Sequence, residues 1–323
     1  MKYFLLVVAL IGLVSLGIFA YLWDDYYAPG PLTEPKTVLF KRGHGFRQIV
    51  DDLGEQGVIR YPLVFKAIAA LTGDARKFKA GEYYFTTAIP PAMVMGMIAQ
   101  GKVVVHKVTV AEGLTVQEIN ALLTKETLLE GDVPTGIEEG SLLPETYYYT
   151  YGDNRADIIH RMQAAMQATL NELWDKRRTD TPLTTRQDII TLASIVEKET
   201  GLPSERPLVA SVFMNRLRLG MKLQTDPTVI YAITKGQTSL GRALTLADLE
   251  TDSPYNTYKY AGLPPGPIAN PGRASIEAAL NPLDSNYLYF VATGNGGHNF
   301  AATLQEHNKN VADYRRSVKK VVQ

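Results

Sequence analysis

The feature that most constrains this chain is an uninterrupted apolar run near its start. Residues 3–23 read YFLLVVALIGLVSLGIFAYLW without a charged side chain, and the run stops at Asp24. As a helix rising about 1.5 Å per residue, it would cover roughly 30 Å, the hydrocarbon thickness of a bilayer. Lys2 precedes it and acids follow, so residues 1–27 are expected to hold a transmembrane helix with a cytoplasmic N-terminus and the rest of the chain outside. The alternative is a cleaved signal peptide, although the run exceeds an ordinary signal core and no A-x-A site follows it.

The composition of the whole chain limits its chemistry. Lys plus Arg and Asp plus Glu are equal at 33 each, which argues against binding of nucleic acid through bulk electrostatics. A polymer substrate would therefore be held by local groups. The chain has no cysteine, which excludes disulfides, thiolate metal sites and cysteine nucleophiles.

A short linker and a small α+β module are expected after the apolar helix. Residues 28–36 contain three prolines and should form an extended linker. The module over 37–108 is predicted to contain a strand at 38–40, a helix with Phe46, Ile49, Val50 and Leu53 at helical spacing, a helix from Pro62, a strand at 81–86, a helix at 90–99 and a strand at 102–110.

Residues 109–323 are expected to form a larger, mainly helical α+β domain. Helices are predicted at 157–174, through TLASIVEKET, through SVFMNRLRL, through TVIYAIT and from about Thr303; 251–273 is predicted as loop, and strands at 287–293 and 298–302 are joined by a GNGG turn. The threonines ending 176–185 suit the N-cap of the next helix. Ser204 with Pro207, and Asp226 with Pro227, are predicted to be the cap and early proline of the two helices that follow.

The chain lacks the motifs of several common enzyme classes. It contains no HExxH, GxxxxGK[ST] or GxSxG sequence, and its five histidines have no metal-ligand spacing. Metal and nucleotide chemistry are therefore not expected. A structural or surface role is expected for each histidine, and a functional role is kept open only for His298, which adjoins a glycine turn.

Two glutamates, Glu197 and Glu199, are the candidate acid–base groups. On a helix turning about 100° per residue, the apolar residues Ile189, Leu192, Ala193 and Val196 form one face, with both glutamates at its margins and Lys198 pointing away. Partial desolvation there would raise a glutamate pKa from about 4.3 toward about 6, so that it could donate a proton at neutral pH. The alternative is that EKET is the solvated end of a helix. The spacing does not choose between the two glutamates.

Three segments combine tyrosine with amide or carboxylate side chains: 139–152, 221–231 and 253–266. Tyrosine faces pack on the C–H surfaces of sugars, and amides and carboxylates bind sugar hydroxyls, so a saccharide groove is one interpretation. Composition alone favours the other, in which these tyrosines pack at borders between loops and core.

Taken in order, ASIVEKET, ASVFMNRL, GMKLQTDPTVIY, YNTY, GLPPGPIANPG and YLYFVATGNGGHNF resemble the motifs of the YceG-like family, the endolytic murein transglycosylases. The resemblance runs from the apolar helix to the C-terminus. It implies a single transmembrane helix, a LysM-like module over 37–108 and a catalytic domain over 109–323. The catalytic acid of the family is the second glutamate of its EKE motif, which implies Glu199 here.

Other motif blocks of the family imply residues that line or support the groove: Glu197, Gln224, Thr225, Asp226, Tyr255, Asn256 and Tyr258. One motif is looser than the rest. SLLPETYYY keeps the frame of EGxxxPxTY but lacks the bulky aromatic residues that some members carry after the glycine. The sugar contacts at that position therefore stay open.

The resemblance implies a peptidoglycan lytic transglycosylase on the cell (inner) membrane, with its catalytic domain in the periplasm. Protonated Glu199 would protonate the oxygen between N-acetylmuramic acid and N-acetylglucosamine and then deprotonate the muramyl C6 hydroxyl, leaving 1,6-anhydro ends that terminate nascent strands. No metal or cofactor is implied. The implied partners are glycan strands, the bilayer and peptidoglycan synthases. Two alternatives stay open: a hydrolase in which Glu197 or Asp226 handles a water, and a non-catalytic scaffold that binds glycan.

Overall fold

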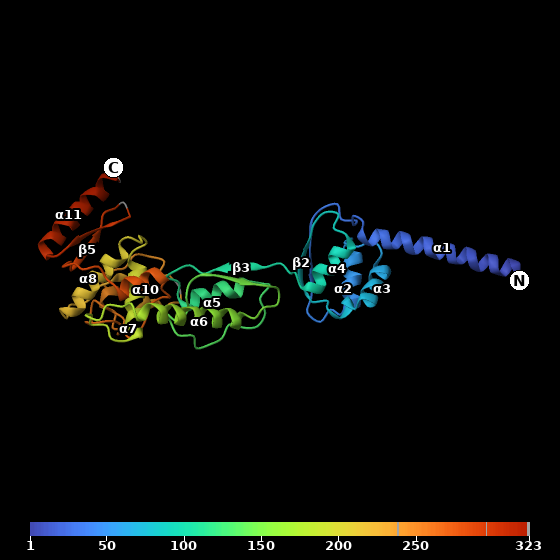
Figure 1. Ribbon diagram of the computed structural model, residues 1–323. Coiled ribbons are helices and arrows are strands. Elements are labelled where there is room, and N and C mark those ends of the chain that lie inside the picture. Colours follow the sequence, from blue (N-terminus) through green and yellow to red (C-terminus); the bar gives the residue numbers. More distant parts are fainter. Residues whose placement is uncertain (238, 295, 322–323) are drawn as a thin grey trace. The chain divides into compact units, whose positions relative to one another are not determined.

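The computed structural model describes residues 1–237, 239–294 and 296–321 (Figure 1). The chain divides into two compact units. The first comprises Met1–His106 with Tyr148–Asp153, and the second comprises Lys107–Tyr147 with Asn154–Gln323. Helices and short antiparallel strands occur together, which confirms the predicted α+β class. The predicted division into a LysM-like module and a catalytic domain stays a prediction about function.

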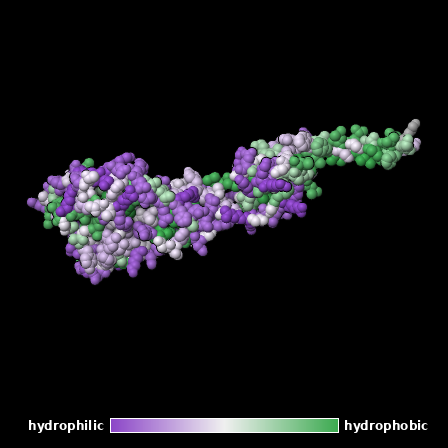
Figure 2. Space-filling view, turned by 60° about the horizontal axis from the view of Figure 1, so that its bottom comes forward, coloured by the Kyte–Doolittle hydropathy of each residue, from purple (hydrophilic) through white to green (hydrophobic). Residues whose placement is uncertain are grey.

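Helix α1 (Lys2–Tyr27) is the long apolar helix expected at the N-terminus. Its most apolar window has a mean hydropathy of 2.7 and is 0% buried, and Figure 2 shows the exposed apolar surface of this helix in green. Exposed apolar surfaces of this extent mark contacts with a membrane or with another protein. By length and composition α1 can cross a membrane, and an N-terminal signal sequence would meet the same criteria.

The last turn of α1 and the segment after it pack into the first unit. Tyr26 is buried, and its hydroxyl donates to Met95 Sδ at 3.3 Å. Within 28–36, Leu32 is buried and its carbonyl accepts a hydrogen bond from Ala88 N at 2.8 Å. Because an apolar side chain of this proline-rich segment enters the core, these residues form part of the first unit rather than a free linker.

Besides α1, the first unit contains a two-stranded sheet and three helices. β1 (Lys36–Phe40) pairs antiparallel with β2 (Gly81–Phe85), with Val38 opposite Tyr83. The helices are α2 (Phe46–Glu55), α3 (Pro62–Thr72) and α4 (Pro91–Gln100), with a 3-10 turn at Asp74–Arg76. Apolar side chains of the strands and helices share one core. These elements confirm the predicted helices and the predicted strands at 38–40 and 81–86.

The predicted strand at 102–110 is wrong in its first half. Gly101 ends α4 in a left-handed conformation, with φ 68°, and Lys102 N donates to Met97 O at 2.9 Å. The chain therefore folds back over the end of the helix, as left-handed helix C-caps allow. The strand begins only at His106.

The second unit is mainly helical. Its helices are α5 (Val116–Lys125), α6 (Arg155–Trp174), α7 (Arg186–Glu199), α8 (Arg206–Arg218), α9 (Asp226–Thr234), α10 (Arg273–Leu280) and α11 (Leu304–Val321), with a 3-10 turn at Asp248–Glu250. β3 (His106–Thr109) pairs with β4 (Thr146–Tyr149), and β5 (Tyr289–Ala292) pairs with β6 (His298–Ala301). The predicted helices and the final hairpin are confirmed, whereas no separate helix was predicted at α5 or α10 and no strand at β4. The predicted GNGG turn includes Asn295, which lies outside the described residues.

Two of the predicted helix caps are wrong by one residue. The N-cap of α8 is Glu205 rather than Ser204, and the N-cap of α9 is Thr225 rather than Asp226. Neither cap side chain bonds to its own helix, because both bond to groups of the candidate site. Thr185 caps α7 in a capping box, as the sequence predicted.

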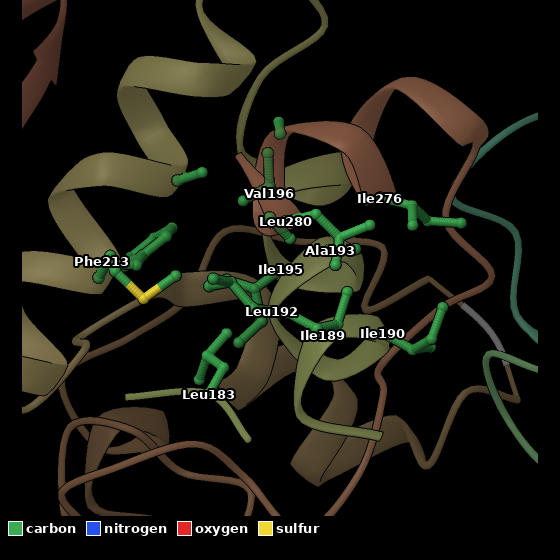
Figure 3. Close-up of a cluster of buried hydrophobic side chains, with 14 of the residues drawn as sticks. Leu183, Ile189, Ile190, Leu192, Ala193, Ile195, Val196, Phe213, Ile276 and Leu280 are labelled. Atoms are coloured by element: carbon green, nitrogen blue, oxygen red, sulfur yellow. The ribbon is translucent and has the colours of Figure 1, made fainter. Parts of the chain in front are cut away.

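Helix α7 lies at the centre of the second unit. Residues 189–196 are all buried, and Figure 3 shows side chains of this stretch packed near Phe213 of α8 and near Ile276 and Leu280 of α10. The single apolar face predicted for this helix is therefore wrong. Polar side chains on the other faces are buried too, and Ser194 Oγ is satisfied by Thr191 O at 2.8 Å. The core surrounds the middle of α7, so only its first turn, 186–188, and its C-terminal end, from Glu197, reach the surface.

Candidate active site

The C-terminal end of α7 opens into a cleft of about 470 Å³. Its walls come from α7, α8, the start of α9, the loop that follows the 3-10 turn, the β5–β6 hairpin and α11. Polar and charged side chains in these walls include Glu199, Arg216, Gln224, Asp226, Tyr258 and His298. A concave site of this size with a few convergent polar groups is typical of small-ligand and substrate sites.

Glu199 is the part-buried acid of this cleft. Thr225 Oγ1 donates a hydrogen bond to its Oε1. Burial raises the pKa of Glu199 above its ordinary value and the nearby charge of Asp226 raises it further, whereas the Thr225 bond, His298 and Arg216 lower it. The carboxyl group is thus biased toward its protonated form while groups that stabilise the carboxylate surround it. Such a group can release a proton and take one back.

Asp226 is a second carboxylate in the same cleft. Tyr258 Oη donates to its Oδ1 at 2.6 Å. Desolvation, and then this bond, raise the pKa of Tyr258, so the phenol keeps its proton. Gln224 lies beside this pair with φ 52°, a left-handed conformation that is costly for a residue with a side chain. Its N–H donates to Thr257 O at 3.2 Å, which helps to hold that conformation.

Asn256 organises the loop that carries Tyr258. It is fully buried, and its Nδ2 donates to Leu249 O at 2.9 Å and to Thr251 O at 2.8 Å. Its Oδ1 accepts a hydrogen bond from Tyr258 N at 2.9 Å. Asn256 does not line the cleft, so its contribution is to fix the loop and not to touch a substrate.

Glu197 and Tyr255 also lie away from the cleft. The Glu197 side chain is only 5% exposed, and its oxygens accept hydrogen bonds from Arg206 Nη2 at 3.0 Å and Gly272 N at 2.8 Å. Tyr255 packs on Tyr231 with ring centroids 4.9 Å apart. Both side chains therefore support the packing of the unit.

Two side chains outside the predicted set of site residues also line the cleft, Arg216 and His298, and only for His298 did the sequence leave a functional role open. Arg216 of α8 is buried, and its guanidinium donates to Leu288 O and Leu223 O, each at 2.7 Å. Burial lowers its pKa, but arginine stays protonated in proteins. His298, the first residue of β6, is held by Glu205, whose oxygens contact His298 Nδ1 at 2.7 Å and His298 N at 2.8 Å.

Comparison with known proteins identifies the family. The model of the YceG-like family matches residues 38–313. The chain belongs to the YceG-like family. A protein of Bacillus subtilis (strain 168) named endolytic murein transglycosylase is 33% identical over 298 residues, which cover 83% of this chain and 81% of that protein. One with the same name from Streptococcus pneumoniae (strain D39) is 30% identical over 329 residues, covering 87% of this chain and 58% of that protein. The crystal structure of a YceG-like protein of Listeria monocytogenes matches with TM-score 0.52 and 33% identity, over 86% of this chain and 99% of that one.

The site residues predicted for this YceG-like chain fall into two sets. The set gathered at the cleft comprises Glu199, Gln224, Thr225, Asp226 and Tyr258. The set that lies outside it comprises Glu197, Tyr255 and Asn256. Of the three tyrosine-rich segments, 221–231 and 253–266 contribute residues to the cleft, whereas 139–152 does not.

One feature of this YceG-like sequence could have indicated that Arg216 is buried at the cleft. It lies three residues after Phe213 on α8, so it shares a helix face with a core residue. Arginine is rarely buried without a partner, so an arginine on a buried helix face is a candidate site residue. No group of three metal-ligating side chains that could hold a metal ion occurs among the described residues.

Proposed function

We propose that this chain is a lytic transglycosylase that cleaves the bond between N-acetylmuramic acid and N-acetylglucosamine in peptidoglycan. The observation that carries the proposal is Glu199, a part-buried carboxyl group with a raised pKa at the wall of a polar cleft. Membership of the YceG-like family and the relatives named endolytic murein transglycosylase support it.

In the first step, protonated Glu199 donates its proton to the glycosidic oxygen. The bond from that oxygen to C1 of the muramyl residue breaks as C1 becomes oxocarbenium-like. Asp226 lines the same cleft, and its negative charge favours a positive centre there. Arg216 and His298 favour the carboxylate that Glu199 has become.

In the second step, the Glu199 carboxylate takes the proton of the C6 hydroxyl of the same muramyl residue. O6 then bonds to C1 and closes a 1,6-anhydro ring, which returns the proton to Glu199 without consuming water. Because the nucleophile belongs to the reacting ring, proximity replaces activation of an external water. One carboxyl group serves as both acid and base, so the Thr225 hydroxyl that bonds to it keeps it oriented through both steps.

A hydrolase on the same bond is the second candidate. Hydrolysis usually needs a second carboxylate, and Asp226 lines the cleft where it could handle a water. Glu197 is poorly suited to that role, because Arg206 and Gly272 occupy its oxygens outside the cleft.

The test is mass spectrometry of the products formed from purified glycan strands by the full chain in detergent. We expect ends that are one water lighter than hydrolysis products, and none with Glu199→Gln. Reducing ends that contain the water would replace the proposal with a hydrolase. Strands that are bound but never cut would replace it with a non-catalytic scaffold.

We infer further that α1 anchors the chain in the cell (inner) membrane, with a cytoplasmic N-terminus and the catalytic unit outside. On this view the enzyme cuts within nascent strands and terminates them beside peptidoglycan synthases, and residues 37–108 form a LysM-like module. The absence of native cysteine permits a clean test. Single cysteines introduced at position 2 and on an exposed face of the second unit should be labelled by an impermeant maleimide only at the second position.

A further inference from the structure

A second hollow adjoins the cleft in the second unit. It has a volume of about 450 Å³ and is lined by Leu208, by residues 283–287 and by residues 298–300. His298 lines both the hollow and the cleft. The two concave regions therefore share one lining side chain. We propose that this hollow binds the glycan strand beyond the sugars that react, an inference that rests on the proposed function.

The wall of the hollow offers the chemistry that sugars require. Asn286 and Asn299 are exposed, and neither side-chain amide has a hydrogen-bond partner within the part of the chain that the structure describes. Tyr287 and Phe300 lie beside them with ring centroids 5.7 Å apart. Amides can donate to and accept from sugar hydroxyls, and aromatic rings pack on the C–H surface of a sugar ring.

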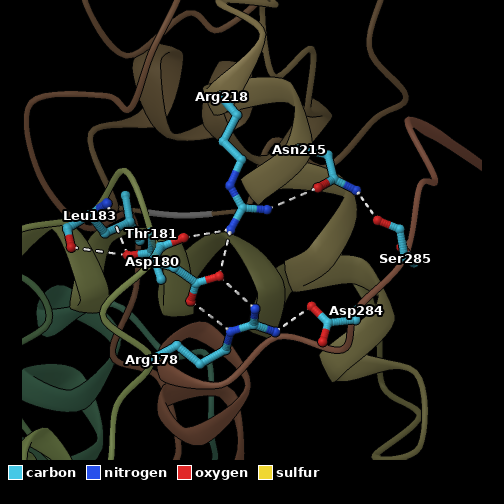
Figure 4. Close-up of polar contacts among 8 residues, drawn as sticks. All are labelled: Arg178, Asp180, Thr181, Leu183, Asn215, Arg218, Asp284 and Ser285. Atoms are coloured by element: carbon cyan, nitrogen blue, oxygen red, sulfur yellow. Dashed lines mark hydrogen bonds and ion pairs between the residues drawn. The ribbon is translucent and has the colours of Figure 1, made fainter.

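The segment that carries these groups is held in place before any ligand binds. Asn215 of α8 donates to Ser285 O at 2.8 Å and to Tyr287 O at 3.0 Å. Arg178 forms an ion pair with Asp284, and Figure 4 shows these contacts fixing Asp284 and Ser285. A preformed wall lowers the entropy lost on binding. The hollow is therefore suited to bind without rearrangement.

The hollow presents hydrogen-bonding and aromatic groups rather than an array of like charges. Neither lysine nor arginine lines it among the described residues, and its single carboxylate, on Asp284, is paired with Arg178. A glycan strand that extends beyond the cleft on the side of His298, the residue that both regions share, would meet the hollow.

Binding measurements in a Glu199→Gln background separate this hollow from catalysis. The full chain in detergent is titrated with peptide-free glycan strands, either long or short enough to fill only the cleft. Asn286→Ala and Asn299→Ala should each weaken binding of long strands by on the order of fivefold, the effect of one hydrogen bond, and leave short oligomers unchanged. Asn281→Ala is the matched control, because Asn281 is an exposed asparagine of the same connection that lines neither region.

In the cleaving chain, the same two substitutions should raise KM for long strands and leave kcat unchanged. Unaltered binding of long strands, or an equal loss for short oligomers, would overturn the proposed subsite. Anhydro products combined with unaltered binding would refute the subsite and leave the proposed function standing. Conversely, the two substitutions could weaken binding of long strands while the wild-type chain cuts nothing. That result would leave the subsite standing and refute the proposed function.

Discussion

Replacing Thr225 with valine tests whether one hydroxyl sets the acidity of Glu199. Thr225 is 2% exposed, and its Oγ1 donates to Glu199. Valine has nearly the same shape, and the bond from the backbone N of residue 225 to Thr257 Oγ1, 3.1 Å long, does not involve the lost hydroxyl. The substitution should therefore remove the donor without opening a cavity.

The size of the effect follows from the strength of such a bond. A hydrogen bond to a charged group contributes about 1.5–3 kcal/mol, and one pKa unit corresponds to about 1.4 kcal/mol. Arg216 and His298 remain beside Glu199 and continue to favour its carboxylate. We therefore expect the pKa of Glu199 to rise by about one unit in Thr225→Val. The sign is upward because the lost bond stabilised the ionised form.

The assay is the pH dependence of kcat/KM on glycan strands, since its alkaline limb reports the essential acid of the free enzyme. In Thr225→Val this limb should move to higher pH. Thr225→Ser keeps the donor and should retain the wild-type limb. Thr228→Val is the matched control, because the Thr228 hydroxyl bonds to Thr225 O and Thr257 and not to Glu199. A limb that stays in place in Thr225→Val, or that moves equally in Thr228→Val, would refute the reasoning.

Three further outcomes are expected. The raised folded-state pKa of Glu199 means that wild type loses stability as the pH rises from the ordinary carboxyl range through the folded value; Glu199→Gln should therefore melt at a higher temperature than wild type above that range and at the same temperature below it. Glu197→Ala leaves the buried Arg206 with less compensation and should cost about 3–5 kcal/mol in urea unfolding while the rate per folded molecule is retained; an unchanged midpoint would contradict this. Glu205→Gln weakens the bond that holds His298 and should lower kcat about fivefold, and an unaltered kcat would exclude a positioning role.

The local elements of this fold could be predicted because their signals lie within a few residues. Helix α7 begins after the threonine cap that the sequence offered and ends at Glu199, within one turn of its last apolar residue, Val196. Early prolines located α8 and α9 to within one residue. Helix α10 escaped prediction because it is short and follows a long loop-like segment that gave no cap signal, since its N-cap is Gly272.

The choice between the two glutamates could not be made from spacing. Glu197 and Glu199 are two residues apart, so they differ by about 200° around α7. Tertiary contacts distinguish the two glutamates. Arg206 and Gly272 donate hydrogen bonds to Glu197, whereas Thr225, the N-cap of α9, donates to Glu199. Only the resemblance to a family assigned the acid. Spacing also gave no means of finding His298 and Arg216 together, because they come from a strand and a helix that meet only in the folded chain.

One physical explanation accounts for the N-caps of α8 and α9, whose side chains do not bond to their own helices. The proposed reaction needs one carboxyl group, that of Glu199, to act as both acid and base. A cap side chain contributes about 1 kcal/mol to its helix, and here Thr225 and Glu205 both bond elsewhere. Burial alone would make Glu199 a group that holds its proton too firmly to become a base. The Thr225 hydroxyl, a histidine fixed by Glu205 and the constant charge of Arg216 oppose that bias. Thr225 and Glu205 therefore leave their helix starts without a side-chain cap bond. Their hydrogen bonds instead favour the Glu199 carboxylate, directly from Thr225 and through His298 from Glu205, and the second step of the proposed reaction requires that carboxylate.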